Sequence, residues 1–361
     1  MSQAPLVLQP LAQLQVAAAS ALVCAGDLLY LLADDELLLQ RYDLNGVFID
    51  QQPLLAGSLP SAAKARKRLK PDFEMLCQLP DGALLALGSG STAARRRGVL
   101  WQAGVTRVLD LTALYLALES QLQDLNLEGA VVQGEHLWLA QRGNSAGSIN
   151  ALIRLDLATL MQQLAGAGLD AEVLRAVHAV ELGTLHGVPL SFTDLCLDAQ
   201  GRLLFAAAAE ATKSSYHDGA CLGSVVGCWH AGQVQSLWPL AGEAKIEGLC
   251  RVADGSLRLV NDPDSRDARS GLYRLVLPYA QAGLAQRHPV VAEASFTDLP
   301  AAVGVDLEQG AGAGAVAGAG DKHAGQQALD LQAHAGLGQL GIGGALRVGK
   351  QGEKCLVITR W

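Results

Sequence analysis

Four carboxylates recur at matching places in the chain, and their spacing is the first indication of chemistry. Each stands at the start of an apolar segment, and a turn follows about seven residues later; the four are Glu74, Glu128, Asp194 and Glu247. Carboxylates that converge on one narrow site repel one another. They must therefore be protonated, paired with cations or bound to a metal ion. We take these four acids as the candidate catalytic residues.

The residue types leave several explanations of the acid cluster open. Oxygen donors favour calcium or magnesium over zinc, and further oxygens from the chain would complete such a site. The predicted metal ligands are Glu74, Glu128, Asp194, Glu247, Asn261 and Asp262. In a second explanation Arg142 and Lys245 neutralise the acids as ion pairs. In a third, an acid accepts hydrogen bonds from backbone N–H groups of the neighbouring structural unit.

Basic and polar residues close to these acids predict that the site receives a small anion. A basic stretch at residues 64–70 precedes Glu74, and an Arg-Arg-Arg run at residues 95–97 follows a GSGS loop. Guanidinium and ammonium groups are suited to phosphate and carboxylate. The predicted substrate-binding residues are Arg142, Asn144, Lys245, Ser89, Arg95 and Arg96. The alternative is that the basic runs form a solvated charged face.

The elements that must position these side chains form a repeated unit. Residues 70–91 contain an acid, an apolar strand, a Pro-Asp-Gly turn and a second apolar strand, and variants return at residues 127–144, 192–210 and 246–262. A looser copy lies at residues 20–35. A third apolar strand follows each copy and a fourth often does. Four short strands per unit, repeated at roughly 45 to 65 residues, are typical of propeller blades.

Five units can be recognised, so we expect an all-β propeller of five four-stranded blades, with six blades as the alternative. The fifth unit lacks a clear fourth strand after Pro278. The apolar segment at residues 6–9 could fill that place and fasten the ring. The pattern of residues 155–176 predicts a short helical insertion in the third unit.

Propeller topology brings the recurring acids together. The first strand of each blade lines the central channel and the second runs back antiparallel to it. The start of the first strand and the end of the second strand therefore lie at the same rim. Loops at that rim are long and polar, whereas the opposite turns are short, and functional residues concentrate on elaborated loops. The mouth of the channel is the predicted site.

The C-terminal part of the chain differs from the repeated units. Residues 310–320 are almost wholly Gly and Ala, and residues 336–349 are again Gly-rich. Such composition cannot bury enough apolar surface to offset the entropy of ordering. We therefore predict a propeller domain in residues 1–300 and a Gly/Ala-rich tail in residues 301–361. Most of residues 309–351 are expected to be disordered.

Composition limits the partners and the compartment. The net charge of −8 argues against nucleic acid as a partner. No apolar run approaches the roughly 18 residues that a membrane span needs. The N-terminus lacks the pattern of a signal peptide, and an odd number of cysteines without a CxxC pair fits a reducing cytoplasm. A cytoplasmic protein with a small anionic ligand is expected, and the residues do not indicate a protein partner.

Several motifs resemble an uncharacterised bacterial propeller family. They are KPDFE at residues 70–74, LGSGST at 87–92, EGA at 128–130, RGN-x5-N at 142–150, FTD at 192–194 and KIEG at 245–248. More distantly, the chain is similar to phytase-like (esterase-like) and gluconolactonase propellers, in which carboxylates and amides hold a divalent ion in the channel mouth. The Glu-Gly pairs at residues 128–129 and 247–248 match the start of a ligand strand there.

The resemblance implies a metal-dependent hydrolase of a small anionic ester, lactone or phosphoester. The implied cofactor is calcium or magnesium, which polarises the substrate and lowers the pKa of a bound water. The alternative function is a non-catalytic propeller that binds a ligand or a protein at the same rim.

Overall fold

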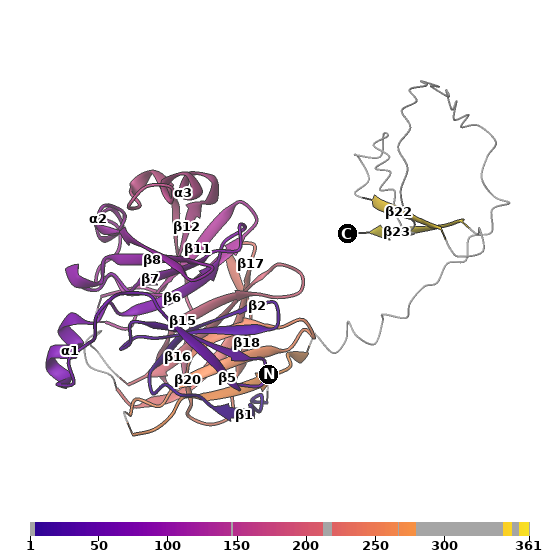
Figure 1. The fold of residues 1–361 in the computed structure, drawn as a ribbon. Coiled ribbons are helices and arrows are strands. Elements are labelled where there is room, and N and C mark those ends of the chain that lie inside the picture. Colours follow the sequence, from indigo (N-terminus) through magenta and orange to yellow (C-terminus); the bar gives the residue numbers. More distant parts are fainter. Residues whose placement is uncertain are drawn as a thin grey trace. The chain divides into compact units, whose positions relative to one another are not determined.

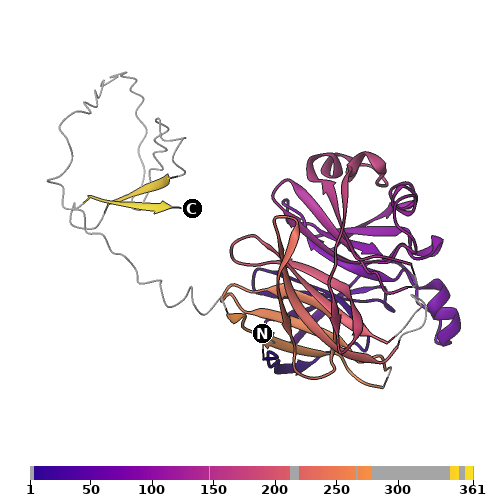
Figure 2. The same cartoon turned by 180° about the vertical axis from the view of Figure 1, so that it is seen from behind.

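The computed structural model describes residues 4–145, 147–211, 219–265 and 267–278, together with the backbone of residues 342–348 and 354–360. The chain divides into two compact units, Met1–Val290 and Val291–Trp361. The first unit contains the repeated sequence, and its strands form the separate sheets of the fold (Figures 1 and 2).

Each repeat forms one antiparallel blade, which confirms the predicted β-propeller. Blade 1 contains β2 (Ala19–Ala25), β3 (Leu28–Ala33), β4 (Leu38–Asp43) and β5 (Phe48–Pro53). Blade 2 contains β6 (Phe73–Gln78), β7 (Leu84–Gly88), β8 (Arg97–Gln102) and β9 (Val105–Asp110). Blade 3 contains β10 (Leu127–Gln133), β11 (His136–Gln141), β12 (Ala151–Asp156) and β13 (Leu174–Ala179).

The fourth blade has an extra short strand, and the fifth is completed from the N-terminus. Blade 4 contains β14 (Thr184–Leu185), β15 (Val188–Leu197), β16 (Leu203–Glu210), β17 (Cys221–His230) and β18 (Gln233–Pro239). Blade 5 contains β19 (Lys245–Arg251), β20 (Leu257–Asp262), β21 (Gly271–Leu275) and β1 (Gln9–Gln13). The inner strands contact one another in the cyclic order β2, β6, β10, β15, β19 and back to β2.

The ring closes because the first strand of the chain joins the last blade. β1 pairs antiparallel with β21, with Gln9 opposite Arg274 and Gln13 opposite Gly271. Just before β1, Leu6 forms a bridge with Leu240 of blade 4. The prediction that an N-terminal segment fills the missing fourth strand is confirmed, although the strand spans Gln9–Gln13 and overlaps residues 6–9 only at Gln9.

Helices lie at the periphery of the ring (Figure 1). The predicted insertion is confirmed by α3 (Leu157–Gln163) and the 3₁₀ turn Ala171–Val173. Two further helices were not expected: α1 (Ala63–Leu69), which is the basic stretch, and α2 (Thr112–Glu119). α2 buries Tyr115 in the core, where its hydroxyl donates a 2.7 Å hydrogen bond to the carbonyl of Gly88. α2, which directly precedes blade 3 in the chain, is therefore attached to the end of β7 in blade 2.

Apolar residues of neighbouring blades pack into shared clusters, as a ring of mutually dependent repeats requires. Met75 and Leu85 of blade 2 belong to the same buried cluster as Leu139 and Ile153 of blade 3. The inner strands approach closely: a Cβ atom on Gly129 would lie 2.8 Å from the Cα of Asp194. Glycine follows the recurring glutamate there because no larger residue fits between the strands.

The second unit is described only in part. β22 (Ile342–Val348) pairs antiparallel with β23 (Lys354–Arg360), with Ile342 opposite Arg360. β22 falls within residues 309–351, which the sequence predicts to be mostly disordered; the other residues of that segment and the predicted domain boundary at residue 300 lie outside the described residues. In the described part of the chain, no helix has the length and apolar character needed to cross a membrane.

Deleting residues 1–13 should destabilise the ring because it leaves the edge of β21 unpaired and uncovers the apolar cluster that Leu6 and Leu8 pack against. We expect the melting temperature to fall by about 5–10 °C, since a domain of this size loses roughly 2–4 °C per kcal/mol. Circular dichroism melting measures the effect, with deletion of residues 1–4 as the control. Equal melting temperatures for both truncations would show that β1 does not fasten the ring.

Candidate functional site at the mouth of the channel

One residue of each inner strand is displaced from the ladder, near the start of β2, β6, β10 and β19 and in the middle of β15. The register skips Ser20 in β2, Glu74 in β6, Glu128 in β10, Thr193 in β15 and Glu247 in β19. A β-bulge of this kind bends the strand and re-aims the side chain. These five residues therefore occupy one equivalent position around the ring, which we call the bulge ring.

The structure corrects the place of Asp194, which was predicted to be equivalent to the three glutamates. Thr193 holds that place, and Asp194 is the next residue along the strand. Its carboxylate accepts 2.8 Å hydrogen bonds from the amides of Leu249 and Leu195. Burial raises the pKa of Asp194 well above its usual value, although these amides oppose the rise. Asp194 therefore links two inner strands by accepting backbone hydrogen bonds. This is the third of the explanations that the sequence leaves open for the acids.

The two hydroxyl residues of the bulge ring connect neighbouring blades. Ser20 Oγ donates a 2.7 Å hydrogen bond to the carbonyl of Phe73 at the start of blade 2. Thr193 Oγ1 makes the corresponding 2.7 Å bond to the carbonyl of Ile246 at the start of blade 5. Three glutamates of the ring are then left to shape the mouth.

A second set of polar residues lies two positions before the bulge ring. Asp72, Asn126 and Lys245 occupy this offset in blades 2, 3 and 5. Sequence reasoning missed Asp72 as a site residue, although it stands in the KPDFE motif. Its backbone adopts φ 56°, in the left-handed region. Ser89 donates to its carboxylate at 2.6 Å, and Arg95 lies 2.8 Å from the same oxygen.

On one side of the mouth, two cations tie blades 3, 4 and 5 together. Arg142 contacts Glu128 at 3.2 Å and Glu210 at 2.6 Å, and it lies 3.6 Å from Glu247. Lys245 contacts Glu247 at 2.9 Å and Glu210 at 3.1 Å. We call these five residues the Arg142–Lys245 network. The ion-pair explanation therefore describes Glu128 and Glu247.

Burial and charge oppose each other within this side of the mouth. Burial raises the pKa of Glu128 to about 8, even though Arg142 acts against it. Burial likewise raises the pKa of Asp262 to about 8, with Lys245 acting against it. For Glu210 burial also favours the neutral acid, but Arg142 and Lys245 outweigh it and hold the pKa below its usual value. Within the network, burial therefore dominates at Glu128, whereas the two cations dominate at Glu210.

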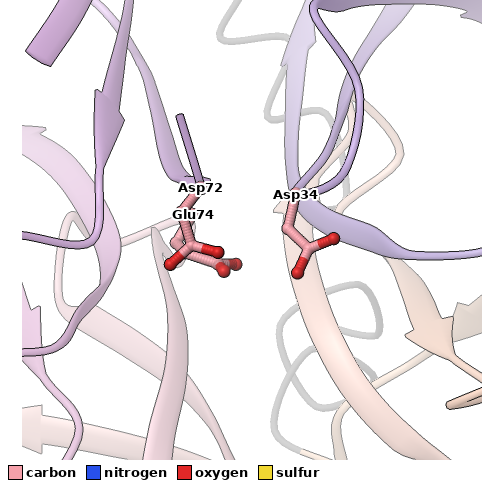
Figure 3. A group of neighbouring side chains, drawn as sticks. All are labelled: Asp34, Asp72 and Glu74. Carbon is pink, nitrogen blue, oxygen red and sulfur yellow. The ribbon is translucent and has the colours of Figure 1, made fainter. Parts of the chain in front are cut away.

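On the other side of the mouth, Asp34, Asp72 and Glu74 turn their carboxylates toward one another (Figure 3). One oxygen of each lies within 4.8 Å of the others. Lys70 is the counter-ion: its ammonium contacts Asp34 and lies 2.7 Å from Asp72. We call the three acids the acidic triad. Sequence reasoning assigned Lys70 only to the basic run, because its partners lie at distant positions in the chain.

The acidic triad offers the oxygen donors that calcium and magnesium prefer. Its chemistry therefore fits a divalent cation, but Lys70 and Arg95 already neutralise Asp34 and Asp72. A metal ion there competes with the ammonium of Lys70. The six ligands predicted from the sequence do not form one site, because Asp194 lies elsewhere and Asn261 accepts a 2.7 Å hydrogen bond from the amide of Gly271 within blade 5.

Glu74 differs from the other carboxylates at the mouth. No hydrogen bond or ion pair joins it to another residue in the described part of the chain. Burial raises its pKa well above the usual value, and the charges of Asp72, Glu128 and Asp34 raise it further while Lys70 opposes them. Glu74 is therefore a carboxyl group whose charged form is opposed both by burial and by the neighbouring carboxylates.

The two sides of the mouth enclose a polar cavity of about 90 Å³. Of the predicted site residues, those that line it are Glu74, Glu128, Glu247, Arg142, Asn144, Lys245, Arg95 and Asp262. A wider hollow of about 820 Å³ shares Asp34, Lys70 and Asp262 with the cavity and extends along α1. The inner cavity has room for several waters or for a small polar group.

Two predicted substrate-binding residues are outside this lining. Ser89 is buried and supports Asp72 from behind. Arg96 instead pairs with Glu119 of α2 at 2.5 Å. The prediction of an anion-binding basic patch is weakened by this geometry, because Lys70, Arg95 and Arg96 each contact a carboxylate of the chain itself.

Comparisons with known proteins concern both the sequence and the fold. A family model described as "Family of unknown function (DUF6929)" matches residues 15–277. No curated protein matches the chain. Among solved structures, the glutaminyl cyclase of Myxococcus xanthus is 13% identical with a TM-score of 0.43, over 76% of this chain and 100% of that one.

Two further solved structures have comparable values. A gluconolactonase of Xanthomonas campestris is 10% identical with a TM-score of 0.37, over 70% of this chain and 73% of that one. A streptogramin B lyase is 11% identical with a TM-score of 0.36, over 76% of this chain and 100% of that one. The activities in these names are those of the proteins that bear them.

The substitution Glu247→Gln separates ion pairing from metal binding at the mouth. It removes the 2.9 Å partner of the buried Lys245, and breaking a buried pair costs about 3–5 kcal/mol. Because Lys245 keeps Glu210 as a partner, we expect a loss near the lower end of that range, equal in calcium and in chelator. Thermal melts of the variant and of the control Glu135→Gln, at the opposite end of blade 3, give the comparison.

Two other results would contradict the ion-pair account of Glu247. A stabilisation by calcium that is present in the unsubstituted protein and absent from the variant would indicate a metal held by this residue. A variant that melts at a higher temperature would show instead that the acids only crowd one another.

Proposed function

The chain belongs to the family of unknown function DUF6929, and we propose that it is a hydrolase that acts on a small polar ester or lactone at the channel mouth. The observation that carries this proposal is Glu74. A carboxyl group with a strongly raised pKa that faces a cavity is a candidate general acid–base catalyst. No other carboxylate that lines the described cavity combines these properties with the lack of an ion-pair partner.

Glu74 acts in the protonated form. Water adds to the carbonyl carbon of the substrate, and the bond from that carbon to the leaving oxygen breaks. The carboxyl group of Glu74 donates its proton to the leaving oxygen, and the proton that the water loses returns to Glu74. The products are an alcohol and a carboxylic acid, so atoms and charge balance.

The surrounding residues keep Glu74 in this state. Burial raises the pKa of Glu74 most, and the charges of Asp72, Glu128 and Asp34 raise it further, while Lys70 opposes them. The Arg142–Lys245 network fixes Glu128 and Glu247 on the opposite side of the cavity. The site therefore surrounds Glu74 with fixed side chains that favour its protonated form, which is the arrangement that general acid catalysis requires.

A divalent cation is the cofactor that the resemblance to gluconolactonases implies. Asp34, Asp72 and Glu74 would hold it, and it would supply polarisation of the substrate carbonyl. Lys70 already supplies positive charge at that place, so the steps assigned to Glu74 do not depend on the ion.

A non-catalytic binding propeller is the second candidate. It is favoured by the number of carboxylates at the mouth that are already neutralised by Arg142 and Lys245. Such a network would make the mouth a rigid polar binding site. The two candidates differ in whether Glu74 takes part in turnover, which makes this residue the place to test them.

A screen of small esters, lactones and phosphoesters should yield a hydrolysed substrate, and Glu74→Gln should abolish that activity. The amide keeps the shape but cannot donate a proton, so we expect a loss of about 10²–10⁴-fold in kcat. Because the protonated form is active, the rate should fall as the pH rises through the raised pKa of Glu74. Glu135→Gln serves as the matched control.

Two results would contradict a catalytic role for Glu74. Turnover by Glu74→Gln at the rate of the control would place the chemistry elsewhere. No turnover of any of the three substrate classes, with or without calcium or magnesium, would favour the binding propeller.

A further inference from the structure

We propose that the substrate of this site carries an ammonium group, which Glu247 and Asn144 bind while Glu74 faces the bond that is cleaved. This inference rests on the proposed function and names the substrate class as a small amine-bearing ester or lactone. The hydrogen-bonding groups at the mouth that lack a partner within the chain support it.

The cations that face the cavity are engaged by the protein itself. Arg142 uses both terminal nitrogens, one on Glu128 and one on Glu210. Lys245 lies within 3.1 Å of oxygens of Glu247, Glu210 and Asp264. Lys70 and Arg95 both contact Asp72. An incoming anion would have to break these contacts to find a positive group.

Acceptor oxygens, in contrast, remain without partners. Glu247 is only 4% exposed, and its Oε2 has no hydrogen-bond partner among the described residues. The same is true of Asn144 Oδ1. Both side chains line the cavity. A buried acceptor without a partner costs about 1–3 kcal/mol, so a ligand that donates hydrogen bonds is stabilised there.

One donor is also left over, the Nε of Arg142. It belongs to a guanidinium whose other nitrogens are held by Glu128 and Glu210. A neutral oxygen of the substrate, such as an ester carbonyl, suits this group. The unpartnered atoms together therefore match an ammonium with an ester close to it better than they match a carboxylate or a phosphate.

The mouth already shows how it binds an ammonium. Lys245 Nζ lies 2.9 Å from Glu247 and 3.1 Å from both Glu210 and Asp264. These are ordinary N–H···O hydrogen-bond distances. An ammonium has three donors, which is enough for both Glu247 Oε2 and Asn144 Oδ1.

The volumes of the cavity and of the adjoining hollow limit the size of the substrate. A cavity of about 90 Å³ holds the ammonium and the reacting group. The remainder of the molecule lies in the hollow of about 820 Å³, which α1 borders with Lys64, Arg66 and Lys67. A small amine with an ester or lactone near its nitrogen fits this arrangement.

Calorimetric titration in an amine-free buffer tests the inference without requiring turnover. The probes are n-propylammonium, propionate, 1-propanol and calcium, matched in size for the three organic molecules. We expect saturable binding of n-propylammonium only. Glu247→Gln should weaken it about tenfold or more, since a charge-assisted hydrogen bond is lost. Glu135→Gln should bind as the unsubstituted protein does.

A second variant keeps the test valid if Glu247→Gln does not fold. Asn144→Asp adds an acceptor charge at a half-buried position and should tighten n-propylammonium about tenfold. Binding of propionate or of calcium in place of n-propylammonium would overturn the proposal, as would binding that neither variant changes. Amine binding by a Glu74→Gln protein that retains full turnover would reject only the catalytic role of Glu74.

Discussion

Charge neutralisation at the narrow end of the channel is the constraint on which the rest of the structure depends. Propeller topology brings the starts of five inner strands together, and three of them present a glutamate there. Arg142 and Lys245 make this possible, because each lies between carboxylates of different blades. Without these cations, buried like charges would oppose the closure of the ring.

The same constraint divides the mouth into two chemically different sides. In blades 3, 4 and 5 the charges are matched by the Arg142–Lys245 network, so that side is fixed. In blades 1 and 2 Lys70 and Arg95 neutralise Asp34 and Asp72, and Glu74 is left beside them without a cation of its own. A proton is then the remaining way to remove its charge. The structure of the mouth and the function proposed for it thus have one cause, which is the incomplete pairing of a crowded set of acids.

Much of this could be predicted from the sequence because it follows from periodicity. The blade count, the rim and the roles of Glu74, Glu128 and Glu247 as equivalent residues come from the repeat itself. The error at Asp194 arose because a β-bulge shifts the register by one residue and leaves no mark in composition. Aligning Phe192 with Phe73 would have identified Thr193 instead.

Other features could not be predicted because they depend on contacts between distant residues. The pairing of Lys70 with Asp34 and Asp72 requires two blades to be in place. α2 was overlooked because its apolar side chains follow directly after those of β9, so the helical period has no visible beginning. Which cation neutralises which acid is set by the ring and not by spacing along the chain.

The charge state of Glu74 tests the central claim most directly. Carbon-detected NMR of the side-chain carboxyl groups, assigned through Glu74→Gln, follows the ionisation of this residue against pH. The account predicts that Glu74 titrates well above the value of about 4.3 that is usual for glutamate. A carboxyl resonance of Glu74 that titrates at or below that usual value would contradict the account.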